Sequence, residues 1–115
     1  MSKFRRIYRD DIHAHLRAGS AMTVVEALPE KYYRDGHLPG AIQMGHDEIH
    51  EHAADRLPDK DAFIVVYCAN TPCQNSRIAA RTLAAMGYTR VAEYEEGKQD
   101  WLDAGLPVET GLRAA

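Results

Sequence analysis

The chain has 115 residues, a net charge of −3 at pH 7 and two cysteines. This length predicts one domain over residues 1–115, with its core between about 5 and 110. Charges of both signs are interspersed, which excludes a clustered basic surface and predicts no nucleic-acid partner. No apolar segment follows the basic start and no apolar run approaches about 18 residues, so we expect a cytoplasmic protein without membrane contact. Two cysteines alone favour a working thiol in a reducing compartment over a disulfide framework.

The first half of the chain alternates between predicted helices and strands. Ile12 and Leu16 lie four positions apart behind an acidic pair, which predicts a short helix over Arg9–Ala18 that ends at Gly19. Four further elements are predicted before the middle of the chain: a strand over Met22–Ala27, a helical turn over Glu30–Arg34, a strand over Ala41–Met44 and a surface helix over His46–Leu57.

The middle of the chain carries its most informative stretch. Every residue of Phe63–Tyr67 is β-branched or aromatic, which predicts a strand over Ala62–Tyr67 that is buried on both faces. Cys68 then stands at the carboxyl end of this strand. Asn75 or Ser76 is the predicted N-cap of the following helix, whose apolar stripe is Ile78, Ala79, Leu83 and Met86 and whose end is Gly87.

A strand over Arg90–Tyr94 and a short helix over Gln99–Asp103 complete the predicted elements. Their alternation indicates the α/β class, with a central, mostly parallel sheet and helices on both faces. Ligands of such sheets bind at the carboxyl ends of the strands, which is where Cys68 lies. A thiol there faces backbone N–H groups and the positive end of a helix dipole, so we expect a pKa below the reference value of about 8.5.

Three motifs resemble the rhodanese (sulfurtransferase) family, in the order expected along roughly residues 23–109. Val-Val-Tyr-Cys, ending at Cys68, resembles the active-site strand, and Ser76, the Ala79–Ala80 pair, Leu83 and Gly87–Tyr88 resemble its helix. Asp35–Ile42 resembles the family's Gly-His-Ile-Pro-Gly-Ala-Ile segment. Gly97, Trp101 and Ala104–Val108 resemble its ending. The resemblance implies that Cys68 accepts sulfane sulfur as a persulfide and passes it to a thiophilic acceptor, without a metal or organic cofactor.

The loop after Cys68 departs from the commonest pattern of that family. It has a second cysteine, Cys73, in a Cys-x4-Cys arrangement, and it lacks the usual arginine and glycine. Cys73 is either a second working thiol or a half-buried residue at the helix entry. Arg77 is a candidate anion contact, and without a loop cation we expect thiosulfate to be a poor donor. The predicted substrate-binding loop consists of Ala69, Asn70, Thr71, Pro72, Gln74, Asn75 and Ser76.

Two alternative functions remain beside sulfur transfer from a small-molecule or protein donor. One is a non-catalytic rhodanese-like binding or regulatory module, and the other is a dithiol redox protein that uses Cys68 and Cys73. Phosphatase or arsenate chemistry on a related fold needs Cys-x5-Arg, but the sixth position after Cys68 is Gln74.

Several other side chains could be mistaken for parts of a site. His46 and His50 lie one turn apart on the predicted surface helix, but three or four convergent ligands are needed, so we expect no metal site. Tyr67 and Trp101 are expected in the core, and His37 is expected to be structural.

Overall fold

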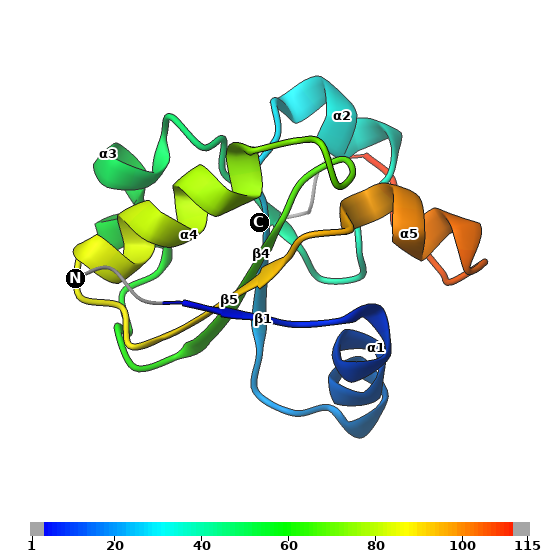
Figure 1. Cartoon of the computed structure of the whole chain (residues 1–115), viewed down its shortest axis with the longest axis horizontal. Coiled ribbons are helices and arrows are strands. Elements are labelled where there is room, and N and C mark those ends of the chain that lie inside the picture. The colour runs from blue at the N-terminus through cyan, green and yellow to red at the C-terminus, as the bar shows by residue number, and fades with distance from the viewer. Residues whose placement is uncertain (1–3, 112–115) are drawn as a thin grey trace.

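Five parallel strands form the central layer of the protein in a computed structural model, which describes residues 4–111. Their order in the sheet is β1-β5-β4-β2-β3, with β4 in the middle (Figure 1). The strands are β1 (Arg5–Arg6), β2 (Thr23–Glu26), β3 (Ile42–Gln43), β4 (Phe63–Tyr67) and β5 (Arg90–Tyr94).

Helices cover both faces of this sheet. They are α1 (Arg9–Ala18), α2 (Glu30–Asp35), α3 (Ile49–Arg56), α4 (Asn75–Ala85) and α5 (Gly97–Asp103). Buried side chains of α3 and α4 pack on one face, whereas Ile12 of α1, Tyr33 of α2 and Trp101 of α5 pack on the other. The expected α/β architecture is therefore confirmed, and its sheet is parallel throughout the described residues.

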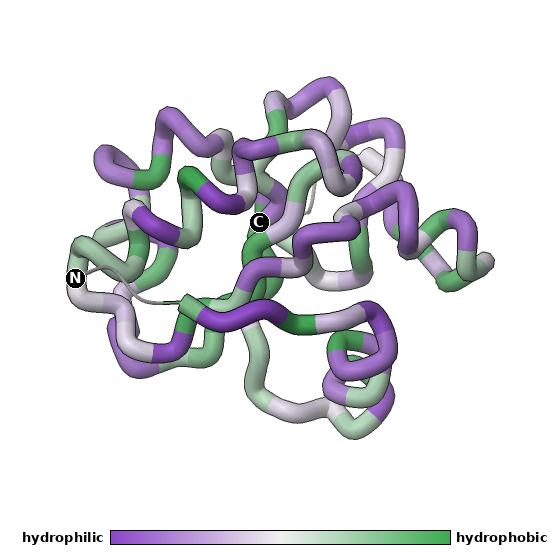
Figure 2. The backbone as a smooth tube through the Cα atoms, viewed as in Figure 1, coloured by the Kyte–Doolittle hydropathy of each residue, from purple (hydrophilic) through white to green (hydrophobic). Residues whose placement is uncertain are grey.

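The strand β4 is buried at every position and divides its side chains between the two faces. Ile64 and Val66 point toward α3 and α4, and Val65 and Tyr67 point toward the opposite layer. Hydrophobic residues follow the central strands, while hydrophilic residues dominate the outer turns of the helices (Figure 2). This alternation sends the side chains of consecutive residues at the end of β4 to different faces.

Every predicted element is present, and its ends match the prediction or differ from it by up to three residues. Gly19 ends α1 in the left-handed conformation at φ 68°, as predicted. Trp101 is fully buried, and so is Tyr67, which confirms the expected core positions. Ile78 departs from its predicted stripe because it is 41% exposed, so α4 packs through its small residues Ala79 and Ala80 together with Leu83.

Two elements differ more clearly from the sequence-based expectation. The strand β1 was not predicted, because Arg5–Arg6 has no apolar pattern, yet it pairs with β5 at the edge of the sheet. The helix α3 begins at Ile49 and not at His46, since residues 46–48 form a turn in which the Glu48 N–H donates to the Gly45 carbonyl at 2.8 Å. Over residues 4–111, no helix is long and apolar enough to cross a membrane.

Candidate active site

Cys68 follows the last residue of β4 and is fully buried. Its backbone is held by the start of α5: the Lys98 N–H donates to the Cys68 carbonyl at 2.9 Å, and the Gln99 N–H donates to the Ala69 carbonyl at 2.8 Å. Gly97 makes this close approach possible at φ +69°, because a Cβ there would lie 2.4 Å from the Cys68 carbonyl oxygen. The first residues of α5 therefore fix the position of the cysteine.

The loop after Cys68 folds back over its side chain. The Cys73 N–H donates to the Asn70 carbonyl at 3.1 Å and closes a turn. The Cys68 sulfur lies 3.5 Å from the Cys73 carbonyl oxygen and 3.4 Å from the Ser76 hydroxyl oxygen, and its single S–H is shared between these two acceptors. The side chain of Cys68 thus lies between the loop and the first turn of α4, and the loop separates it from solvent.

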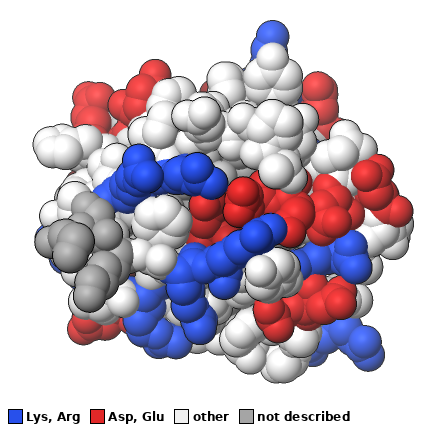
Figure 3. Space-filling model, in the orientation of Figure 1, with Lys and Arg blue, Asp and Glu red and all other residues white. Residues whose placement is uncertain are grey.

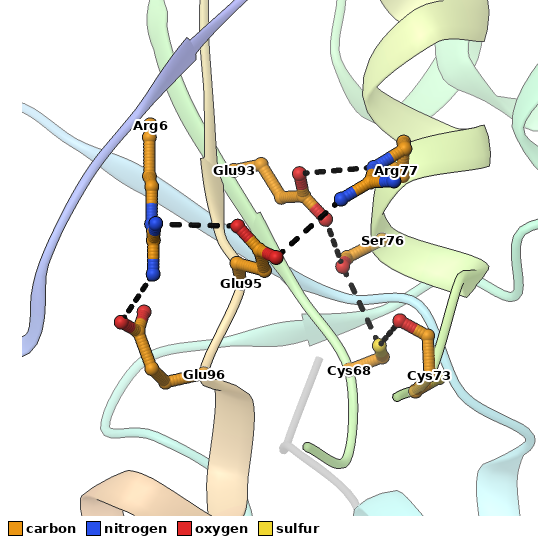
Figure 4. Close-up of polar contacts among 8 residues, drawn as sticks. All are labelled: Arg6, Cys68, Cys73, Ser76, Arg77, Glu93, Glu95 and Glu96. Carbon is orange, nitrogen blue, oxygen red and sulfur yellow. Dashed lines mark hydrogen bonds and ion pairs between the residues drawn. The ribbon is translucent and has the colours of Figure 1, made fainter. Parts of the chain in front are cut away.

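Ser76 links the thiol to a buried carboxylate. Its hydroxyl donates to Glu93 Oε2 at 2.7 Å, and the Glu93 residue is 4% exposed (Figure 4). Arg77 Nε lies 3.9 Å from the other Glu93 oxygen. The predicted N-cap is wrong, since α4 begins at Asn75 without a side-chain cap and the Ser76 hydroxyl bonds to β5 instead. The result is a chain of contacts from Cys68 through Ser76 and Glu93 to Arg77.

The thiol of Cys68 is less acidic than the sequence predicts. Burial, together with the neighbouring Cys73 thiol, raises the pKa of Cys68 to about 11. The Ser76 backbone N–H at the start of α4 acts in the expected direction and lowers the pKa, as does the Ser76 hydroxyl when it donates to the sulfur, but burial outweighs both. The expectation failed because the sequence shows a helix start after the cysteine but not how deeply the loop buries it.

A second buried glutamate, Glu26, contacts the side chain of Tyr67, the last residue of β4. The Tyr67 hydroxyl donates to Glu26 Oε1 at 2.7 Å, and Lys98 Nζ lies 2.9 Å from the same oxygen. Glu26 is fully buried, and burial raises its pKa despite these two contacts. The Leu38 N–H donates to the Tyr67 hydroxyl at 3.1 Å, so this network joins β2, β4 and the start of α5.

The model of the rhodanese-like domain family matches residues 9–104 of the chain. The chain belongs to this family. Among curated proteins it is 34% identical over 95 residues to the HTH-type transcriptional regulator Rv0324 of Mycobacterium tuberculosis and 39% identical over 64 residues to the thiosulfate sulfurtransferase PspE of Escherichia coli. These matches cover 83% and 56% of the chain, but only 41% and 59% of the two relatives.

Solved structures resemble the rhodanese-like domain closely. The BH2092 protein of Bacillus halodurans is 27% identical with a TM-score of 0.85, over 92% of this chain and 77% of the other. The rhodanese-like domain of Alr3790 from Anabaena has the same identity and a TM-score of 0.82, over 96% and 82%. A rhodanese of E. coli, solved with anions, is 31% identical with a TM-score of 0.67, over 79% and 100%.

The predicted loop residues of this rhodanese-like domain fall into two groups. Ser76 is buried beside the thiol, and Cys73 is partly exposed with its carbonyl against Cys68. The remaining loop positions are exposed or partly exposed and form the outer surface of the loop, namely Ala69, Asn70, Thr71, Pro72, Gln74 and Asn75.

Arg77, the candidate anion contact, is turned toward acidic residues. Its Nη2 lies 3.4 Å from Glu95 Oε1 as well as near Glu93. Arg6 of β1 in turn pairs with Glu95 at 3.4 Å and with Glu96 at 2.5 Å. Acidic side chains therefore gather between the basic side chains of α4 and β1 on this face (Figure 3).

The histidines of the rhodanese-like domain form no metal cluster in the described part of the chain. His46 precedes α3, so it is not one helical turn from His50 as predicted. The ring of His37 stacks on Tyr33 at 3.7 Å between centroids and is 1% exposed, which confirms its structural place.

Sequence reasoning did not single out Glu93. The signal was present, because an acidic residue between Val91, Ala92 and Tyr94 interrupts an otherwise apolar strand. Its partner Ser76 is seventeen positions away in the chain, and only the packing of α4 on β5 brings the two together. The missed residue is the one that connects the thiol to a charge.

Proposed function

We propose that this rhodanese-like domain is a sulfurtransferase that carries sulfane sulfur as a persulfide on Cys68. The observation that carries the proposal is the position of the Cys68 thiol, at the carboxyl end of the central strand and against the start of α4. The 39% identity to a thiosulfate sulfurtransferase of E. coli supports it, although that match covers 56% of the chain.

The chemistry has two balanced steps. The Cys68 thiolate attacks the outer sulfur of a donor such as glutathione persulfide; a new S–S bond forms to Cys68, and the donor's S–S bond breaks to release glutathione. With thiosulfate the leaving group is sulfite. A thiophilic acceptor then attacks the outer sulfur of the persulfide and regenerates the Cys68 thiolate. Neither step needs a cofactor.

The buried thiol sets two requirements for this reaction. A pKa of about 11 leaves only about one part in ten thousand of Cys68 as thiolate at pH 7. The donor can reach Sγ only when the loop over residues 69–74 opens, since Cys68 itself has no exposed surface. Opening the loop also hydrates the thiol and lowers its pKa, so access and activation occur in one movement.

The surroundings of the loop favour a donor with little negative charge. Arg77, the cation next to Ser76, is already paired with Glu93 and Glu95. A groove of about 360 Å³ reaches Asn75 at the start of α4, and its lining includes the acidic residues Glu30, Asp47 and Glu48. We therefore propose a persulfide donor, small or protein-bound, in preference to the dianion thiosulfate.

Intact-mass measurement tests the proposed function. Incubation of the wild-type chain with glutathione persulfide should add one sulfur atom that a reductant removes. Cys68→Ser should abolish this gain, and Cys73→Ser should retain a substantial part of it. Sulfur carried by the Cys68→Ser protein would move the nucleophile to Cys73. No gain in any variant would favour a non-catalytic binding module, a function that the match to a transcriptional regulator also suggests.

A dithiol redox function is the second candidate, and the proximity of Cys73 favours it. The Cys73 carbonyl is 3.5 Å from the Cys68 sulfur, and the Cys73 thiol is near enough to raise the pKa of Cys68. Attack of the Cys73 thiolate on the inner sulfur of the persulfide would form a Cys68–Cys73 disulfide and release hydrogen sulfide. A low-molecular-weight thiol would then reduce the disulfide. Loaded wild-type protein should release sulfide without an added acceptor, whereas loaded Cys73→Ser should not.

A further inference from the structure

We propose that Glu93 holds reduced Cys68 in its thiol form by fixing the direction of the Ser76 hydroxyl, an inference that rests on the proposed role of Cys68 as the sulfur acceptor. Of Ser76 and Glu93, only Ser76 contacts the reacting sulfur. Glu93 acts through Ser76 and is therefore a positioning residue.

The Ser76 hydroxyl has a single proton to donate. A carboxylate only accepts hydrogen bonds, so Ser76 must be the donor in its 2.7 Å contact with Glu93. The lone pairs of the same oxygen then face Cys68, whose S–H donates to it at 3.4 Å. A thiolate has no proton to donate and needs one from Ser76. The same hydroxyl cannot serve the carboxylate and the thiolate at once.

The Ser76 hydroxyl forms a stronger hydrogen bond with the Glu93 carboxylate than with the Cys68 sulfur. A hydrogen bond to a charged oxygen at 2.7 Å is short and charge-assisted, whereas contacts to sulfur are longer and weaker. Forming the Cys68 thiolate therefore requires Ser76 to give up its bond to Glu93 or leaves the thiolate without this donor. Glu93 opposes ionisation in both cases, and its own negative charge adds to the effect.

A relay that carries the Cys68 proton through Ser76 to Glu93 does not fit the relative basicities of a thiolate and a carboxylate. A glutamate carboxylate is in general a far weaker base than a thiolate, and the conjugate acid of this thiolate has a pKa of about 11. Transfer of the Cys68 proton through Ser76 to a carboxylate is therefore uphill. Restraint of the thiol, not its activation, is the effect that the geometry produces.

The other charged groups around the pair do not cancel this effect. From α4, Arg77 faces Glu93 at 3.9 Å but shares its guanidinium with Glu95. From β1, Arg6 is the register partner of Glu93, and its side chain pairs with Glu95 and Glu96. From the loop, the Cys73 thiol also raises the pKa of Cys68. Glu93 therefore remains the acidic group in contact with Ser76.

Restraint by Glu93 protects the cysteine of the resting protein. Oxidants and stray electrophiles react with thiolates, and a thiol held in its protonated form reacts slowly. Entry of a donor that moves the start of α4 would part Ser76 from Glu93 and allow the hydroxyl to turn to the sulfur. Reactivity would then be tied to the occupied site.

A pH titration of the thiolate tests the proposal without requiring sulfur transfer. In a Cys73→Ser background, the rate of iodoacetamide alkylation measured against pH reports the thiolate of Cys68 alone. Glu93→Gln should lower the titration midpoint by about one unit, which is about tenfold more thiolate at a given pH. Glu95→Gln is the matched control, since it removes a nearby charge that does not touch Ser76, and it should shift the midpoint by much less.

The route through Ser76 is tested by a double variant. In a Ser76→Ala background, Glu93→Gln should no longer lower the midpoint by its full amount, because the hydroxyl that it releases is absent. Circular dichroism checks folding, and if Glu93→Gln does not fold, Glu93→Asp, with its shorter side chain, should give a smaller shift in the same direction.

The outcomes separate the inference from the proposed function. An unchanged midpoint in Glu93→Gln overturns the inference, and a raised midpoint overturns it in favour of a proton acceptor. A full shift that persists without Ser76 also overturns it, since Glu93 would then act by charge alone. Failure of sulfur loading in the mass experiment would refute the sulfurtransferase and leave the titration result unaffected.

Discussion

Two buried glutamates, Glu26 and Glu93, lie near the carboxyl ends of the strands on opposite faces of the sheet. Glu26 lies on the face of Tyr67, and Glu93 lies on the face of Cys68. Glu26 contacts Tyr67 and a lysine directly, at 2.7 and 2.9 Å. Glu93 contacts a serine at 2.7 Å, and its cation is 3.9 Å away. The Glu26 carboxylate pairs directly with a cation and links neighbouring strands to the start of α5. The Glu93 carboxylate is one hydroxyl away from a thiol, so its charge acts on chemistry.

The role of a buried carboxylate therefore depends on what its hydrogen-bond partner contacts next. Beyond Lys98 the Glu26 network continues to the Tyr32 carbonyl at 2.8 Å, which is backbone. Beyond Ser76 the Glu93 network reaches the sulfur of Cys68. We therefore expect changes around Glu26 to alter stability and changes around Cys68 to alter reactivity.

The largest expected effect is the pH dependence on the Cys68 side. Because burial raises the pKa of this thiol to about 11, the thiolate fraction rises about tenfold per pH unit below that value. Sulfur loading from thiosulfate, whose charge is constant in this range, should increase about a thousandfold from pH 7 to pH 10. Tyr67→Phe, on the other face, should show the same slope. A plateau already reached near pH 8.5 would mean that the thiol is not buried in solution.

The next largest effect lies on the Glu26 side and concerns stability. Glu26→Ala leaves the Lys98 ammonium, with a side chain 13% exposed, without its carboxylate. Breaking such a buried pair should lower the free energy of unfolding by about 3 kcal/mol, measured by urea denaturation. Cys68→Ser, the comparison variant, should lower it by about 1 kcal/mol or less. Equal losses in both variants would erase the distinction between the two sides.

Donor preference should show a ten- to hundredfold effect. Each absent charge-assisted hydrogen bond costs a dianion about 1.5–3 kcal/mol, so kcat/KM should be roughly ten- to a hundredfold higher for glutathione persulfide than for thiosulfate. Arg77→Ala should change the thiosulfate value little, because Arg77 is already paired with Glu93 and Glu95. A preference for thiosulfate that is lost in Arg77→Ala would place that arginine at the loop after all.

The smallest expected difference separates two glycines in the same backbone conformation. Gly97 and Gly105 have φ +69° and +70°, but only at Gly97 would a Cβ meet the Cys68 carbonyl. Both alanine substitutions should cost about 1–2 kcal/mol for the left-handed conformation. Gly97→Ala should cost about 2 kcal/mol more and reduce sulfur loading. Urea denaturation measures the difference, and identical values would show that the start of α5 can move aside.

The fold could be predicted because its signals are local. The buried strand Phe63–Tyr67, the helical period after it and the ordered family motifs specify the α/β sheet and place Cys68 at its edge. The two-residue strand β1 escaped prediction because pairing with β5 alone defines it. A strand of two arginines has no periodicity to detect.

The candidate site was predictable in position but not in its electrostatics. The two residues that contact the Cys68 thiol, Cys73 and Ser76, follow it within eight positions of the chain, so sequence alone identified both. The acidity of the thiol depends on burial by the loop and on a glutamate of β5 that reaches Ser76 across the sheet. Both are properties of packing between distant segments, which no short motif records.

The edge strand β1 also constrains the order in which the chain can fold during synthesis. Arg5 and Arg6 pair only with Ala92 and Glu93, so this strand has no sheet partner until nearly the whole domain has left the ribosome. One edge of the buried strand β4 likewise has no pairing partner until β5 has been synthesised. The emerging chain therefore exposes apolar strand surface until a late step, when β5 and then β1 complete the sheet.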